Sequence, residues 1–327
     1  MVLHGHCCHH QRADDRAPSR FVNTHVHARK TCDTFINSFS LSRRGEDTLP
    51  LSWRDKYTEG LREKKTLLVV GLDPTPESLP PQLKKEAEGD EWWEPVGNYL
   101  KGIVEETHEL VLGYKMNSAF YERMGPDGLG TMLEVKKHAE RSDSSLLLIF
   151  DGKRGDISHT AESYSSAIYD TWGFDATTIS PYMGWDAVEP FYRRVGKLTI
   201  LLVRTSNPSG GEVQMWGEPP LYLRIAELIA ERDPRGDLGA VVGATHPKEL
   251  KEIRNILGRR RAILVPGVGV QGGDAAEVLK QGEGVMLVNV SRGVILGWKK
   301  GGWPRGVKEA AKRFSAALKV HQPQRFI

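Results

Sequence analysis

Residues 146–157 read Leu-Leu-Leu-Ile-Phe-Asp-Gly-Lys-Arg-Gly-Asp-Ile, an unbroken apolar run that passes into closely spaced charges. An apolar run without alternation predicts a strand that is buried on both faces, as in a parallel sheet covered by helices. The charges that follow then lie at the carboxyl end of that strand. The stretch therefore predicts an α/β fold with polar chemistry gathered at one edge of its sheet.

Seven further runs of this kind recur along the chain. With Leu146–Lys153, the expected strands are Thr66–Asp73, Leu110–Lys115, Asp175–Tyr182, Leu198–Thr205, Ala240–Ala244, Ala262–Val268 and Val285–Val290. Apolar stripes at helical spacing lie between them, for example at Val96, Leu100, Ile103 and Val104. Eight strands that alternate with helices predict a (β/α)8 TIM barrel. A doubly wound parallel sheet is the competing architecture, but it usually has fewer strands and a glycine-rich turn after the first.

The first 55 residues differ in composition from the rest. They hold six of the eleven histidines and all three cysteines, and they lack a sustained apolar period. We expect residues 1–55 to be a disordered or targeting-like extension and residues 56–327 to form the barrel. The start of the chain, rich in His and Cys, resembles a set of metal ligands. Without a second ligand pair at zinc-finger spacing, a flexible tail is favoured there.

Charge and cysteine content narrow the class of function. Lys and Arg number 45 against 42 Asp and Glu, a formal net charge of +3, whereas a nucleic-acid binder needs a clustered excess of cations. No apolar run reaches the roughly 18 residues of a membrane span. We therefore expect neither nucleic acid nor membrane as a partner. The region after Cys32 has no cysteine for a disulfide, which favours a reducing compartment such as the cytoplasm, with organellar targeting by the extension as the alternative.

Polar residues gather where the expected strands end, which is where TIM barrels carry their active sites. The polar strand ends are residues 71–74, 114–117, 150–157, 204–208, 266–274 and 289–293. The third end is the densest. Asp151 and Lys153 are two residues apart, so they point to the same side of an extended strand. Lys115 ends the neighbouring strand, and Asp156 stands three residues beyond Lys153.

These four residues predict a series that alternates in sign, Lys115–Asp151–Lys153–Asp156. Flanking carboxylates keep a lysine protonated and aim it as a proton donor. A carboxylate fixed beside negative charge on a substrate also destabilises the anionic ground state more than a transition state that has lost that charge. A structural ion-pair network is the alternative, and Asp156 also fits the N-cap of a helix that starts at residues 157–159.

The ends of the seventh and eighth strands are typical of a phosphate site. The glycine-rich loop at residues 267–273 allows close backbone approach, Gln271 can donate an amide N–H, and Arg292 can grip a phosphate through two bonds. The loop also matches the dinucleotide-binding pattern Gly-x-Gly-x-x-Gly. That reading is rejected because the match follows the seventh strand, and the next strand ends in Asn289 instead of an acidic residue.

At these residues the sequence resembles the orotidine 5′-phosphate decarboxylase family, in the branch with Asp-x-Lys-Arg-x-Asp-Ile, here Asp151–Ile157. The resemblance runs from about Leu67 to about Gly297. The stretches that support it are residues 70–74, 113–120, 204–208 and 266–271. It implies a TIM barrel that decarboxylates orotidine 5′-phosphate to UMP in de novo pyrimidine biosynthesis. It also implies that no metal or other cofactor takes part, and that the enzyme is a homodimer with shared active sites.

The resemblance also implies a role for each matched position. Lys153 protonates C6 of the pyrimidine, and Asp151 crowds the departing carboxylate and holds Lys153. Lys115 and Asp73 bind ribose hydroxyls, with Asn117 nearby. The remaining roles are contacts across the dimer interface by Asp156, Ile157 and Thr160, contacts to the pyrimidine by Thr205, Ser206 and Pro266, and contacts to the phosphate by Gln271 and Arg292. His159 is a local departure, since some relatives carry Asn there.

Two other functions remain as alternatives. A metal-dependent sugar-phosphate decarboxylase or aldolase of the same superfamily would need acidic ligands around a magnesium ion and would lose activity with a chelator. A non-catalytic nucleotide-binding barrel would be expected to lack one of the four alternating charges, and this chain has all four.

Overall fold

The strands of the fold pair in parallel in chain order and close into a barrel, β1 to β8. The computed structural model of the chain describes residues 51–85, 93–269 and 272–326. The strands are β1 Leu68–Gly71, β2 Gly113–Asn117, β3 Leu147–Arg154, β4 Ala176–Ile179, β5 Leu198–Arg204, β6 Leu238–Val242, β7 Ala262–Pro266 and β8 Met286–Val290. The expected (β/α)8 TIM barrel is therefore confirmed.

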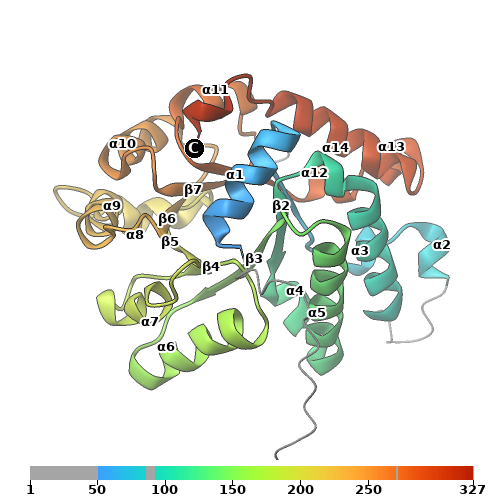
Figure 1. Cartoon of the computed structure of the whole chain (residues 1–327), viewed down its shortest axis with the longest axis horizontal. Helices are drawn as coiled ribbons and strands as arrows, with labels where there is room; N and C mark the ends of the chain where they lie inside the picture. The colour runs from blue at the N-terminus through green and yellow to red at the C-terminus, as the bar shows by residue number, and fades with distance from the viewer. Residues whose placement is uncertain (1–50, 86–92, 270–271, 327) are drawn as a thin grey trace, which may run out of the picture. The chain divides into compact units, whose positions relative to one another are not determined.

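Helices surround the barrel and connect its strands (Figure 1). In the described part of the chain they are α1 Trp53–Lys64, α2 Pro81–Lys84, α3 Trp93–Thr107, α4 Ser118–Glu122, α5 Gly125–Ser142, α6 Ser158–Ser165, α7 Glu189–Tyr192, α8 Gly211–Gln214, α9 Leu221–Arg232, α10 Pro247–Leu257, α11 Ala275–Gln281, α12 Arg292–Ile295, α13 Trp298–Gly301 and α14 Arg305–Ala317. A π-helical segment, Ser166–Thr171, continues α6. None of the described helices is both long enough and apolar enough to cross a membrane.

The strands are buried almost throughout, which explains their continuous apolar character. One set of side chains fills the barrel interior while the alternate set packs under the helices, so neither set meets water. Several strand boundaries differ from expectation by two or three residues, among them the first residues of β2 and β6. Strand β2 begins at Gly113 and not at Leu110, because a 3₁₀ turn at His108–Leu110 extends α3. Strand β6 begins at Leu238 and not at Ala240.

Helix α1 lies across the amino ends of the strands. Its Trp53 donates Nε1–H to Asp237 just before β6 at 2.9 Å, and its Tyr57 hydroxyl accepts the N–H of Met286, the first residue of β8, at 3.1 Å. The helix begins at Trp53, so residues 53–55, which were expected in the extension, belong to the barrel's first helix. Residues 1–50 lie outside the described part of the chain. Since α1 occupies the amino end, the opposite end is left for the site.

Candidate active site

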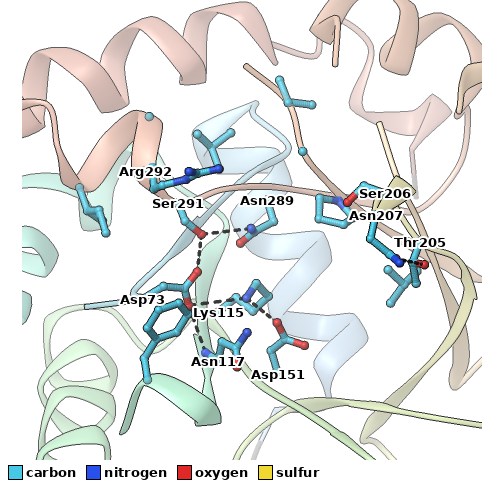
Figure 2. A pocket seen from close by; sticks show the side chains of 18 of the residues that line it. Asp73, Lys115, Asn117, Asp151, Thr205, Ser206, Asn207, Asn289, Ser291 and Arg292 are labelled. Carbon is cyan, nitrogen blue, oxygen red and sulfur yellow. Dashed lines mark hydrogen bonds and ion pairs between the residues drawn. The ribbon is translucent and has the colours of Figure 1, made fainter. Parts of the chain in front are cut away.

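A cavity of about 820 Å³ opens at the carboxyl ends of the strands. Figure 2 shows its polar side chains converging from different strands of the barrel. The cavity is lined by nine of the residues expected in the site: Asp73, Lys115, Asn117, Asp151, Lys153, Thr205, Ser206, Pro266 and Arg292. Barrel closure therefore brings together residues that lie up to about 220 positions apart in the sequence.

Three charges form the centre of this cavity. Lys115 on β2 donates from Nζ to Oδ2 of Asp151 on β3 at 2.7 Å, and Lys153 donates to Oδ1 of the same carboxylate at 2.7 Å. The side chains of Lys115 and Asp151 are 5% and 9% exposed, whereas that of Lys153 is 46% exposed and faces the open cavity. Two fixed cations thus share one buried carboxylate, and one of the cations is accessible to a ligand.

Electrostatics keep the buried pair of Lys115 and Asp151 charged. Burial alone raises the pKa of a carboxyl group, but the ammonium groups of Lys115 and Lys153 outweigh burial and hold the pKa of Asp151 well below its usual range. Burial alone lowers the pKa of a lysine, but Asp151 and Asp73 outweigh it and raise the pKa of Lys115 above its ordinary value. Near neutral pH, Asp151 is therefore an anion and Lys115 a cation.

Asp73, just after β1, is held by groups from two other strands. Its Oδ2 accepts the hydroxyl of Ser291 at 2.6 Å, its Oδ1 accepts the backbone N–H of Asn117 at 3.2 Å, and Lys115 Nζ lies 3.8 Å from Oδ1 (Figure 2). Gly71 makes this arrangement possible, because a Cβ at that position would occupy the space of the Ser291 side chain. Asp73 is therefore oriented before any ligand arrives.

The loop after β5 is tied down by an amide from α8. Gln214 accepts the N–H of Thr205 at 2.9 Å and donates to the Thr205 hydroxyl at 2.7 Å. That hydroxyl in turn donates to Asn207 at 2.6 Å. Both the backbone and the side chain of Thr205 are thus fixed where the loop lines the cavity.

The loops after β7 and β8 also line the cavity. Pro266 ends β7 and lines the cavity, and the following Gly267 and Gly269 have φ values of 99° and 84°, which favour glycine. Arg292 is exposed at the first position of α12 and reaches the cavity. Gln271, expected beside it in a phosphate site, lies outside the described residues.

Asp156, Ile157 and Thr160 do not line the cavity of their own chain. Asp156 Oδ1 accepts the N–H of Ile157 at 2.8 Å, and its carboxylate forms no ion pair within the described ranges. The series of charges within one chain therefore ends at Lys153. Asp156 is not a helix N-cap either, because α6 begins at Ser158 and its N-cap is Ile157.

Three residues that hold the site were not among the expected ones: Ser291, Gln214 and Thr178 on β4, whose hydroxyl donates to Oδ1 of Asp151 at 2.7 Å. Ser291 stands next to Arg292 in a strand end that the sequence marked as polar, so its position was a signal. Thr178 and Gln214 gave no such signal, because hydroxyl and amide side chains are common at strand ends and in short helices. Among the described residues, no group of three or more His, Cys, Asp or Glu side chains is placed to hold a metal ion.

Comparison with known proteins agrees with this geometry. The family model described as the orotidine 5′-phosphate decarboxylase / HUMPS family matches residues 66–297. The chain is 39% identical over 269 residues to the orotidine 5′-phosphate decarboxylase of Herpetosiphon aurantiacus, which covers 81% of this chain and 96% of that relative. It is 34% identical over 283 residues to that of Variovorax paradoxus, covering 84% and 100%.

A solved structure is similar over the same region. The structure of Leishmania donovani OMP decarboxylase is 31% identical in sequence, with a TM-score of 0.68, and the match covers 82% of this chain and 98% of that one. The match of the family model spans more than half of the chain, and the relatives are covered over nearly their whole length. The chain therefore belongs to the orotidine 5′-phosphate decarboxylase / HUMPS family.

Proposed function

We propose that this chain decarboxylates orotidine 5′-phosphate to UMP and carbon dioxide, a reaction of de novo pyrimidine biosynthesis. The observation that carries the proposal is the position of Asp151 between Lys115 and Lys153 inside the cavity. Similarity to decarboxylases over most of the chain supports the same reaction.

The central charges account for the chemistry. The bond between C6 and its carboxylate breaks, carbon dioxide leaves, and the electron pair remains on C6. The ammonium of Lys153 then transfers a proton to C6, and solvent returns a proton to the lysine. Asp151 holds the ammonium of Lys153 through a hydrogen bond until that step, and its negative charge disfavours the substrate carboxylate more than the transition state that is losing it.

The remaining walls of the cavity suit the other parts of the substrate. Asp73 and Lys115 bind ribose hydroxyls, with Asn117 beside them. Thr205, Ser206 and Pro266 contact the pyrimidine, and Arg292 with Gln271 holds the phosphate. Arg292 is suited to this role because guanidinium N–H groups match phosphate oxygens in pairs.

The direct test is loss of orotidine 5′-phosphate absorbance with purified protein, before and after EDTA treatment. We expect the activity to survive EDTA. Lys153→Ala should lower kcat at least about 100-fold, which is the lower end of what a general acid contributes. Lys312→Ala, which removes an exposed lysine on α14 paired with Glu309, is the matched control and should keep full activity. Activity that EDTA abolishes and magnesium restores would favour the metal-dependent sugar-phosphate enzymes.

We further infer that two copies share their active sites. Asp156, Ile157 and Thr160 do not line the cavity of their own chain, and Ile157 is 41% exposed. The loop after the neighbouring strand β4 adds apolar surface, with Tyr182 83% and Met183 49% exposed. In the dimer, Asp156 of one chain extends the charge series at Lys153 of its partner, and Ile157 and Thr160 reach the partner's ribose.

Mixed dimers test this arrangement. Lys153→Ala and Asp156→Ala proteins are each expected to be nearly inactive. After random exchange, about half of the dimers are mixed, and each mixed dimer has one site with both lesions and one intact site, so activity should recover to about a quarter of wild type. Mass spectrometry must show that chains exchanged. Exchange without recovery would mean that Asp156 does not serve the partner's Lys153.

A further inference from the structure

Thr178 on β4 contacts both members of the pair that carries the chemistry. Its hydroxyl lies 2.7 Å from Oδ1 of Asp151, and the backbone N–H of Lys153 lies 3.1 Å from the same hydroxyl. Thr178 is 1% exposed and does not line the cavity. It therefore contacts Asp151 and Lys153 from behind, where a substrate does not reach.

A bulge in β3 explains why this hydroxyl is needed. Phe150 pairs with Thr177 and Arg154 pairs with Ile179, so residues 151–153 face Thr178 alone. Within the bulge Lys153 has a φ of 45°, a left-handed conformation that is unfavourable for residues other than glycine. A bulge also interrupts the ladder of backbone hydrogen bonds. The Thr178 side chain accepts the N–H of Lys153 at this interruption.

The number of protons on the hydroxyl decides the direction of each bond. An ionised carboxylate only accepts hydrogen bonds, so the single hydroxyl proton goes to Asp151. The N–H of Lys153 only donates, so it uses a lone pair of the same oxygen. One hydroxyl therefore joins the Asp151 carboxylate to the backbone that carries Lys153.

We propose that Thr178 is a positioning residue for decarboxylation: its hydroxyl sets the geometry between the Asp151 carboxylate and the left-handed backbone of Lys153. This inference rests on the proposed function. The position of Lys153 Nζ decides whether its proton reaches C6, and a displacement of about 1 Å at a reacting group can cost about 100-fold in rate. Thr178 does not line the cavity, so its hydroxyl makes no direct contact with a bound substrate.

Thr178→Val keeps the shape of the side chain and removes the hydroxyl, while Thr178→Ser keeps the hydroxyl. Thr177→Val is the matched control. Thr177 is the preceding residue, is 0% exposed, and donates its hydroxyl to the carbonyl of Phe150 on β3 at 2.9 Å, but it points to the opposite face of the strand. Thr177→Val loses one buried hydrogen bond to β3, whereas Thr178→Val loses two, those to Asp151 and to Lys153.

We expect Thr178→Val to lower kcat by about 10- to 100-fold with KM within about 3-fold, and Thr178→Ser to restore kcat to within about 3-fold of wild type. Thr177→Val should keep kcat within about 2-fold, although it too loses a buried hydrogen bond and some thermal stability. Hydrogen exchange of the Lys153 amide should accelerate in Thr178→Val and not in Thr177→Val.

Equal kcat losses in the two valine variants, or an unchanged kcat in Thr178→Val, would overturn the positioning role. A wild-type protein that consumes no orotidine 5′-phosphate would instead overturn the proposed function, and with it the role of Thr178 in that reaction. The amide exchange of Lys153 separates the two failures, because it reports on the bulge without any turnover.

Discussion

The ammonium of Lys115 lies 2.7 Å from Oδ2 of Asp151, inside a barrel that leaves only 5% of the lysine side chain exposed. Neither charge has enough water around it to be stable alone, so each depends on the other. The other oxygen of Asp151, Oδ1, accepts a hydrogen bond from Lys153. A buried ion pair thereby supports an accessible lysine, which is the arrangement that a proton donor needs.

Removal of the shared carboxylate should destabilise the fold in a pH-dependent way. We expect Asp151→Asn to lower the free energy of unfolding by about 3–5 kcal/mol near neutral pH, because it leaves Lys115 buried with only Asp73 at 3.8 Å. The folded-state pKa of Asp151 is depressed, so its stabilising contribution is present above the ordinary carboxyl pKa of about 3.9 and is lost as the pH falls through the folded-state value. Urea unfolding between about pH 3 and 7 should therefore show the gap between wild type and variant narrowing below about pH 4. A gap that stays constant over this range contradicts the prediction.

Gly71→Ala should disturb the ribose side of the cavity. The new Cβ would collide with the side chain of Ser291 and approach Oδ2 of Asp73 to 3.0 Å, so one of them must move. We expect KM for orotidine 5′-phosphate to rise about 10-fold and stability to fall by about 1–3 kcal/mol. Gly130→Ala on α5 is the control, because a Cβ there meets no atom within 4 Å. It should leave kinetics unchanged and raise stability by up to about 1 kcal/mol. Wild-type KM in Gly71→Ala would show that Ser291 does not orient Asp73.

Gln214→Leu should loosen the loop after β5. The substitution removes both hydrogen bonds between Gln214 and Thr205, at 2.9 and 2.7 Å. Thr205 and the following Ser206 then lose their fixed position beside the cavity. We expect KM to rise about 10-fold with a smaller change in kcat, since binding energy is lost to ordering of the loop. Gln281→Leu, which removes a bond to Glu277 within α11, is the control for loss of a glutamine. Identical values of kcat and KM for the two variants would mean that Gln214 does not fix the loop after β5 for substrate binding.

Arg292→Ala tests the location of the phosphate. A charge-assisted bond to phosphate contributes about 1.5–3 kcal/mol, so kcat/KM should fall about 10- to 150-fold. Inhibition by uridine, which lacks the phosphate, should be unchanged while inhibition by UMP weakens. Arg193→Ala removes an exposed arginine that follows α7 and pairs with Glu189, and it should alter inhibition by neither uridine nor UMP. Equal weakening of uridine and UMP would place Arg292 at another part of the nucleotide.

Much of the site could be predicted because its residues follow strands directly. Asp151 and Lys153 stand on one strand at a spacing of two, so a local rule places them on one side, and β2 pairs with β3 as neighbours in the chain usually do. Asp156 shows the limit of this reasoning. It is close to Lys153 in sequence, but β3 ends at Arg154, and Asp156 does not line the cavity of its own chain.

The sequence by itself determined the barrel and the polar end of its strands. Burial on both faces requires continuous apolar strands, and helices must alternate with them. Charges are excluded except where the strands end. Each of these properties can be recognised within a short segment of the sequence. Only the tertiary structure decided how those charges are held. Ser291 donates a hydrogen bond to Asp73, which lies 218 residues away in sequence. Thr178 donates one to Asp151, which lies 27 residues away, at a bulge in β3 that no local sequence pattern predicts. Such contacts depend on which strands become neighbours when the barrel closes and on the register between them, and neither is a property of any single segment.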